Sequence, residues 1–366
     1  MTPEKTIAAI EKIKRDHPNN LMARFFDANW FAELNQNDQK RLRNIINTGI
    51  KNPNSQMGAY AMQADDYEHF SHQFDPMIRT FHAIAEGTAI CQRNDWDTAR
   101  TRCDLAKIDP ALSRVSMRVR IARNFSIFPL PGAMSKNQRI DLEQMVINAL
   151  QSLILRPDFG GRYLSLTPGT AHTMNDEEYS RRVASGQMFK NMSNDKYLRA
   201  AGISADWPHG RGIYVSQKED FIIWVGEEDH LRIMAMQTGS SLDELFERLH
   251  GGLELISNLL PPFAISAKYG AIASCPTNLG AGMRASLHVR LPRLCAIDPT
   301  LEHLIKEAKT LGLAVRGAAG EHSGAGKGGL VDISPSARLG VTQVQIMQRL
   351  YDGITPLWAL EKSLKP

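Results

Sequence analysis

A turn-like segment, Cys275-Pro276-Thr277-Asn278-Leu279-Gly280, leads into the alternating segment Arg284-Ala285-Ser286-Leu287-His288-Val289-Arg290. Successive side chains of a β-strand point to opposite faces of the sheet. Polar and apolar residues alternate in the second segment, so one face would carry Arg284, Ser286 and His288 while the other face is apolar. The pattern predicts a strand with a packed underside and a cationic upper side.

Two further segments have the same construction. In Ser116-Met117-Arg118-Val119-Arg120-Ile121 the two arginines share a face with Ser116. In the segment from Phe221 to Ile233, taken as one strand, Glu228, His230 and Arg232 fall on one face. Clustered guanidinium groups repel one another unless an anion lies among them, and the planar arginine fork suits phosphate oxygens. We therefore expect a polyphosphate site on an antiparallel sheet. The alternative is three ordinary strands with solvated charged faces.

Residues 316–329 form a glycine-rich segment, Arg-Gly-Ala-Ala-Gly-Glu-His-Ser-Gly-Ala-Gly-Lys-Gly-Gly. It does not match a Walker A loop, because Glu321 and Gly328 stand where that motif needs Gly and Ser or Thr. It does not match a dinucleotide-binding turn, because the residues after Gly329 do not open a helix. Arg316 and Glu321 are its chemical content, and we expect a ligand to order them. The alternative is a plain surface loop.

Five motifs follow one another along the chain: Phe74-Asp75-Pro76, Gly210-Arg-Gly-Ile-Tyr214, Ile223-Trp-Val-Gly-Glu-Glu-Asp-His-Leu-Arg-Ile233, Cys275-Pro-Thr-Asn-Leu-Gly280 and Arg316-Gly-Ala-Ala-Gly-Glu-His322. Together they resemble the phosphagen kinases, which move a phosphoryl group between ATP and a small guanidino compound. The resemblance runs from about residue 20 to the C-terminus.

The resemblance implies a role for each polar residue of these segments. Five arginines would hold the phosphates of ATP: Arg118, Arg120, Arg232, Arg284 and Arg316. Ser116, Ser286 and His288 would lie near the nucleotide. Glu228 and Glu321 would grip the substrate guanidinium, with Cys275 beside its reactive nitrogen. A loop of the first domain would hold the far end of the substrate: Ser55, Gln56, Met57, Gly58, Ala59 and Tyr60.

The chemistry of phosphoryl transfer explains why such residues are needed. Its transition state is loose, so alignment and charge stabilisation by cations and Mg²⁺ supply most of the catalysis. A guanidinium is a poor nucleophile because its pKa is above about 12, so two carboxylates must fix its plane and ease proton loss. The implied cofactor is Mg²⁺, held mainly by ATP or ADP and by water.

Cys275 has two interpretations. A lone cysteine before proline is commonly a small buried hydrophobe. Arg284 lies nearby in the sequence, however, and a cationic surface favours the thiolate. We expect Cys275 to aid the substrate electrostatically and not to act as a covalent nucleophile.

Composition narrows the class of protein. The chain has 366 residues, 43% of them hydrophobic, which is enough for two domains with their own cores. The net charge is +4, but no Lys/Arg run or aromatic platform indicates nucleic-acid binding. The four cysteines lack zinc spacing, so we expect a reducing, cytoplasmic setting. Residues 1–20 do not resemble a signal peptide, and no apolar run approaches the ~20 residues of a membrane helix.

The predicted fold class is α+β, with a small all-helical N-terminal domain over residues 1–105 and a larger catalytic domain over 106–366. Strands and helices interleave in the second domain without regular alternation, so we expect an antiparallel sheet flanked by helices. The helices predicted from apolar spacing and capping signals are 23–34, 38–50, 75–90, 142–155, 243–260, 300–311 and 342–352, the last ending at Gly353.

The favoured function is reversible phosphoryl transfer from MgATP to free arginine, by an enzyme that is a monomer or a homodimer. Taurocyamine and lombricine stay open as substrates. Two further alternatives are a protein arginine kinase and a nucleotide-binding protein without catalysis. The chain departs from the resembled pattern in two places: Asn54 and Lys196 replace an Asp–Arg pair between the domains, and no His stands near Gly186. We therefore expect domain closure to be held less firmly.

Overall fold

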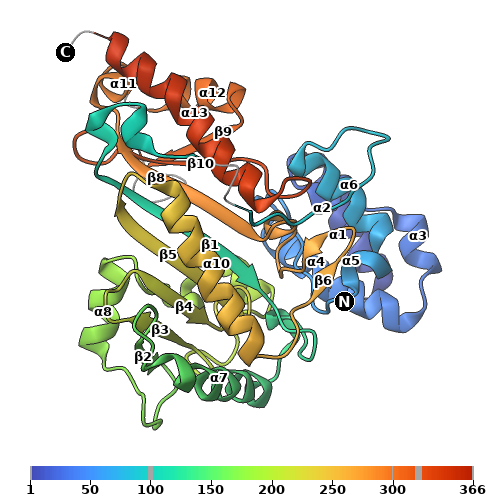
Figure 1. Ribbon diagram of the computed structural model, residues 1–366. Coiled ribbons are helices and arrows are strands. Elements are labelled where there is room, and N and C mark those ends of the chain that lie inside the picture. Colours follow the sequence, from blue (N-terminus) through green and yellow to red (C-terminus); the bar gives the residue numbers. More distant parts are fainter. Residues whose placement is uncertain (1, 98–101, 299, 318–323, 365–366) are drawn as a thin grey trace.

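The structure is a computed structural model that describes residues 2–97, 102–298, 300–317 and 324–364. A group of short helices packs beside a larger part built on one sheet (Figure 1). This arrangement confirms the predicted α+β class. Within the described residues, no helix is both long enough and apolar enough to cross a lipid bilayer.

The N-terminal part is helical, as predicted, and polar caps fix where its helices begin. The Thr2 side chain accepts from the Lys5 backbone N–H at the start of the first helix, and Asn35 caps the fourth in the same way. The predicted helix 23–34 is wrong in one respect: it is broken in two, because Asp27 caps a new helix. The helices are α1 Pro3–Asp16, α2 Leu21–Arg24, α3 Ala28–Glu33, α4 Gln36–Lys51, α5 Asp66–His69 and α6 Ser71–His82.

The core of these helices is completed by residues from much later in the chain. Tyr269, Ile272, Cys275 and Leu279 are buried in the same cluster as the apolar residues of α1 to α6. The Tyr67 hydroxyl donates to the carbonyl oxygen of Ala273 at 2.7 Å. The segment that precedes the strand Met283–Arg290 is thus part of the helical core. The two domains therefore share a hydrophobic interface.

Tyr67→Phe should destabilise the protein by about 1–2 kcal/mol, because the Ala273 carbonyl would stay buried without this hydrogen bond. The free energy of unfolding in urea measures the effect. Tyr197→Phe is the matched control, since its hydroxyl makes no hydrogen bond with any described residue. Equal stability of both variants and the parent protein would contradict this view of the interface.

The larger part is built on an eight-stranded sheet in the order β2-β3-β4-β5-β1-β8-β10-β9. Every neighbouring pair is antiparallel, which confirms the predicted sheet type. The strands are β1 Val115–Arg123, β2 Gly161–Ser165, β3 Gly212–Ser216, β4 Phe221–Val225, β5 Leu231–Gly239, β8 Met283–Arg290, β9 Leu313–Gly317 and β10 Leu330–Pro335, and a separate hairpin joins β6 Ile265–Ser266 to β7 Gly270–Ala271.

Helices cover the apolar face of this sheet. Helix α10 packs on β5 and β1, and α13 packs on β8 and β10 (Figure 1). The predicted end of α13 at Gly353 is wrong, because the helix continues for ten more residues to Ser363. A Cβ at Gly353 would lie 2.6 Å from Leu313 Cδ1, so this glycine permits close packing and does not end the helix. The helices of this part are α7 Lys136–Leu150, α8 Asp176–Ala184, α9 Lys196–Ala200, α10 Leu242–Leu259, α11 Pro292–Ile297, α12 Glu302–Thr310 and α13 Gln343–Ser363.

Candidate active site

The arginines predicted to share a surface do share one. Arg120 pairs with Arg284 across β1 and β8, and Arg118 pairs with Ser286. Opposed residues of antiparallel strands lie on the same face of the sheet. Arg232 is opposite Ala122, and the pairing continues through His288 and Asp332 to Arg316 on β9. We call this surface the arginine face; its arginines are Arg118, Arg120, Arg232, Arg284 and Arg316.

Arg118 and Arg120, at the centre of the arginine face, form no ion pair with any described residue, and the more distant charge of Asp332 acts on Arg118 alone of the two. Burial lowers the pKa of Arg120 well below its ordinary value, and the charges of Arg232 and Arg118 lower it further. The pKa of Arg118 is also lowered, mainly by burial. Burying a guanidinium without an acid is unfavourable unless an anion binds there. The arginine face is therefore suited to a polyanion.

Asp332, which the sequence patterns did not single out, lies at the β10 side of the arginine face. Its Oδ2 lies 3.4 Å from Arg284 Nη2 and 3.8 Å from His288 Nε2. Burial raises the pKa of Asp332, but the polar contact with His288 and the charge of Arg284 outweigh it, so the pKa is lowered. The only signal in the sequence was its position in the alternating strand after the glycine-rich segment.

Arg338 is a second residue that the patterns missed. It lines a small cavity together with Arg120, Arg232 and Arg284. Its guanidinium donates to the Thr277 carbonyl and, at 2.7 Å, to Asn278 Oδ1. No local pattern could find it, because only the folded chain brings residue 338 beside the segment that begins at Cys275.

The continuous strand predicted from Phe221 to Ile233 is wrong. Gly226, with φ of 71°, turns the chain between β4 and β5, so the acids occupy a hairpin turn and not a strand face. His230 does not join the arginine face. Its Nδ1 accepts from the Phe125 backbone N–H at 3.0 Å, and its Nε2 lies 2.9 Å from the Pro129 carbonyl oxygen. His230 therefore has a structural role in the core.

The hairpin turn places acids against the edge of the arginine face. Glu227 and Glu228 lie 2.8 and 3.3 Å from the guanidinium nitrogens of Arg232. Burial, followed by the charge of Glu227, raises the pKa of Glu228 to about 7. The same surface thus carries unpaired cations for an anion and, next to them, a carboxylate that could receive a cation.

Cys275 is close to Glu228, but it is not held as a thiolate. Its Sγ lies 3.1 Å from Thr277 Oγ1. Burial and the charge of Glu228 raise the pKa of Cys275 to about 12, so the expectation that Arg284 favours the thiolate is not met in this ligand-free arrangement. The Cys275 thiol packs between the helical core and Glu228.

The first-domain loop reaches the same place through Tyr60. The charges of Glu228 and Cys275 add to burial in raising the pKa of Tyr60, which shows that the phenol lies near both. Gly58, with φ of 75°, lets the loop pass close to Asn20. The Met57 side chain is buried in the helical core and Gln56 is exposed. Of the loop, Tyr60 is the side chain that the fold brings to the acids.

Glu321 lies outside the described residues, so the second predicted carboxylate has no position here.

Ser286 is buried on β8 beside Arg118, and Ser116 is exposed at the start of β1. A cavity of about 460 Å³ adjoins the arginine face and is lined by Arg118, Arg120, Lys190, Trp224 and Glu227. In the described part of the chain, no three His, Cys, Asp or Glu side chains are grouped as a metal site.

The two domains are joined near this site by hydrogen bonds from α4 to the carbonyls of α9. Asn47 donates to Ala200 at 2.6 Å, and Thr48 donates to Tyr197 at 2.7 Å. Asn52 donates to the Lys196 carbonyl at 3.3 Å. These bonds connect the domains at a place other than Asn54 and the Lys196 side chain, so the expectation that closure is held less firmly stays a prediction.

The fold places a cationic sheet face, suited to a polyanion, next to the contact between the helical part and the sheet. The C-terminal catalytic domain of the ATP:guanido phosphotransferases matches residues 141–364, and the N-terminal domain of the same enzymes matches residues 16–79. The chain therefore belongs to the ATP:guanido phosphotransferase family, the phosphagen kinases, and is a phosphotransferase that acts on a guanidino group.

Known proteins resemble the chain along nearly its whole length. It is 33% identical to an arginine kinase of Plodia interpunctella over 367 aligned residues, which cover 99% of both chains. The duplicated taurocyamine kinase of Schistosoma mansoni, with bound transition state analog components, is 29% identical with a TM-score of 0.81 and covers 97% of this chain and 48% of its own. A lombricine kinase is 26% identical, with a TM-score of 0.81. The match covers 95% of this chain and 94% of the lombricine kinase chain.

Proposed function

We propose that the enzyme transfers the γ-phosphoryl group of MgATP reversibly to a guanidino nitrogen of free L-arginine, giving phosphoarginine and ADP. The observation that carries the proposal is Arg120, which has no acid near it among the described residues, next to Arg232, which pairs with the half-buried carboxylate of Glu228. A polyphosphate and a guanidinium would satisfy these two groups at once.

In this proposal the arginine face holds the phosphates through Arg118, Arg120, Arg232, Arg284 and Arg316. Ser116, Ser286 and His288 border the nucleotide. Mg²⁺ would enter with the nucleotide and share the charge that develops on the transferred group. The five cations are fixed on one sheet face before the nucleotide arrives, so they stabilise that charge without reorganising.

Glu228 is proposed to orient the guanidinium, with Glu321 as its second carboxylate. A nitrogen–phosphorus bond forms, the bond from the γ-phosphorus to the bridging oxygen breaks, and ADP leaves with that electron pair. The nitrogen gives its proton to a carboxylate. A pKa near 7 suits Glu228 to this step, because the group can both accept and release a proton near neutral pH. Cys275 and Tyr60 would border the guanidinium from the side of the helical core.

Glu227→Gln should move the pH profile of activity to lower pH. The deprotonated Glu228 pairs with the guanidinium, so kcat/KM should rise as the pH passes through about 7. Removing the like charge of Glu227 lowers the pKa of Glu228. The rising part of the kcat/KM profile should therefore move to lower pH. Profiles of both enzymes from about pH 5 to 8 check this, and a limb that stays in place or moves upward would contradict it.

Free arginine is favoured by the similarity to arginine kinases, but taurocyamine and lombricine kinases share the fold. The end of the substrate away from the guanidino group would meet the loop of Ser55, Gln56, Met57, Gly58 and Tyr60. Only Gln56 of these is exposed, so few side chains are available to contact a long substrate tail.

A substrate panel tests the proposal. ADP release is measured with MgATP and each of arginine, taurocyamine, lombricine, glycocyamine and creatine, and with a peptide that contains arginine. The highest kcat/KM should belong to free arginine. If another guanidino compound has the highest kcat/KM, that compound and not arginine is the substrate. Activity on the peptide alone would indicate a protein arginine kinase.

A further inference from the structure

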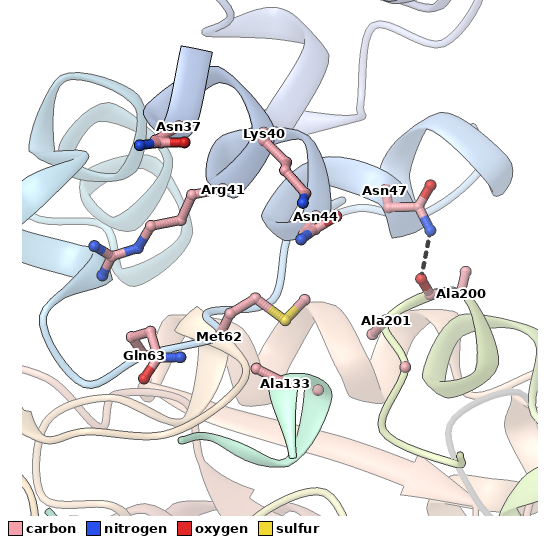
Figure 2. Close-up of a pocket in the computed structure, with 12 residues that line it drawn as sticks. Asn37, Lys40, Arg41, Asn44, Asn47, Met62, Gln63, Ala133, Ala200 and Ala201 are labelled. Atoms are coloured by element: carbon pink, nitrogen blue, oxygen red, sulfur yellow. Dashed lines mark hydrogen bonds between the residues drawn. The ribbon is translucent and has the colours of Figure 1, made fainter. Parts of the chain in front are cut away.

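A second cavity, of about 470 Å³, lies between the two domains, and none of its lining residues belongs to the arginine face (Figure 2). One wall is a polar stripe of α4: Asn37, Lys40, Arg41, Asn44 and Asn47. These positions recur every three or four residues, so they share one face of the helix. The opposite stripe, with Leu42, Ile45 and Ile46, packs in the helical core.

The other wall of this cavity comes from the catalytic domain and from the bend that follows the substrate loop. Ala133, Ala200 and Ala201 form the side of the catalytic domain. Met62 and Gln63 face the α4 stripe from below in Figure 2. The volume falls in the range of small-molecule sites, about 300–1,000 Å³.

The lining has hydrogen-bonding capacity that the protein does not use. Lys40 and Asn44 make no side-chain hydrogen bond or ion pair within the described ranges, and neither does the side-chain amide of Gln63. The two helical side chains extend toward the cavity (Figure 2). None of the described residues that line it is an acid. Arg41 is already paired with Asp65 and Asp66, so among these lining residues Lys40 provides the free positive charge.

We infer that this cavity binds a small hydrogen-bonding anion, a carboxylate or a phosphate ester, and that the ligand links the two domains. The ammonium of Lys40 would pair with the anionic group, while the amides of Asn44 and Gln63 would bond to its remaining polar atoms. The ligand would lie next to the bond from Asn47 to the Ala200 carbonyl, which already joins α4 to the catalytic domain.

Binding in this cavity would also affect the substrate loop. Asp66, the ion-pair partner of Arg41, accepts hydrogen bonds from the backbone N–H groups of Met62 and Gln63 at 2.6 and 2.7 Å. Met62 and Gln63 are two and three residues after Tyr60 in the chain, and Tyr60 lies near Glu228. A ligand that prefers one position of this segment shifts the population of closed enzyme by its difference in affinity.

The test observes the Met62 methyl group, which lines the cavity, by ¹³C NMR of methionine-labelled enzyme. Met62→Leu identifies its resonance. Inorganic phosphate, acetate and neutral glycerol are the probes, with MgADP in excess so that phosphate does not report on the arginine face. We expect a saturable shift with phosphate, with acetate or with both, and none with glycerol. The anion that acts then gives the ligand class.

Two variants localise the effect. Lys40→Met should weaken the anion by about tenfold or more, and Ala133→Trp should remove binding by filling the cavity. Lys12→Met, which removes an exposed lysine of α1, is the control and should change nothing. The inference is overturned if no probe gives a saturable shift, if glycerol acts as well as the anions, or if both variants bind like the parent enzyme. This readout does not depend on the identity of the guanidino substrate, so it can fail while the proposed function holds.

Discussion

Glu228→Gln is expected to lower kcat by about 10²-fold or more, the effect of losing a positioned acid or base. Glutamine keeps the size of the side chain and can still accept the hydrogen bond from Arg232. It cannot carry the charge that fixes a guanidinium or take the proton from its nitrogen. The loss should therefore appear in kcat with the guanidino substrate, measured by ADP release at saturating MgATP.

Binding of MgADP separates a catalytic role from misfolding. Its dissociation constant, measured by calorimetry, should stay close to that of the parent enzyme in Glu228→Gln, because the arginine face is unchanged. Glu254→Gln is the control, since that carboxylate is exposed on α10 and, of the residues that the structure describes, pairs only with His250. Turnover of Glu228→Gln near the level of the control would reject the assignment of Glu228.

Arg120→Met should have opposite effects on nucleotide binding and on stability. Arg120 has no counterion among the described residues, and its neighbours are Arg118, Arg232 and Arg284. Removing a buried cation from a bound anion weakens affinity by about 10²-fold. The ligand-free protein, however, loses a half-buried charge that is repelled by its arginine neighbours, so its free energy of unfolding should stay the same or rise.

Calorimetry with MgADP and urea unfolding without ligand measure the two effects of Arg120→Met. Arg15→Met, on the exposed side of α1, should change neither. A variant that binds MgADP normally would show that the arginine face is not the nucleotide site. A variant that binds weakly and is also much less stable would show that Arg120 has a structural partner.

The arginine face could be predicted from the sequence because strand geometry is local. Alternation with period two assigns Arg118, Arg120 and Arg284 to a face without knowledge of the rest of the fold. Three separate strands then needed only to be neighbours in one sheet, and β5, β1 and β8 are neighbours. The helical character of the first domain could be predicted for the same reason, since capping and apolar spacing are local signals.

Features that depend on distant contacts could not be predicted in this way. Gly226 breaks the alternation that joined Glu228 to Arg232, and only the hairpin brings the two together again. Glycine is typical of a helix end, but Gly353 lies inside α13. Its missing side chain leaves the space in which Leu313 packs. Arg338 reaches the site through contacts with Thr277 and Asn278, which no pattern around residue 338 indicates.

The protonation of Cys275 is a further case. Proximity to Arg284 in the sequence favoured a thiolate, whereas burial in the helical core and the charge of Glu228 oppose it. A substrate guanidinium placed between Glu228 and the thiol would lower the pKa of Cys275, because it would bring a positive charge to both groups. In the proposed reaction, the charge of this side chain would therefore depend on substrate binding.

The proposed reaction is tested most directly by detecting its product by ³¹P NMR. The enzyme is incubated with MgATP and free L-arginine, and the spectrum is followed until it no longer changes. We expect a new phosphoramidate resonance that grows in step with that of ADP, and that shrinks again with formation of ATP when excess MgADP is added. A spectrum with ATP unchanged, or with inorganic phosphate and ADP but no phosphoramidate, would contradict phosphoryl transfer to arginine.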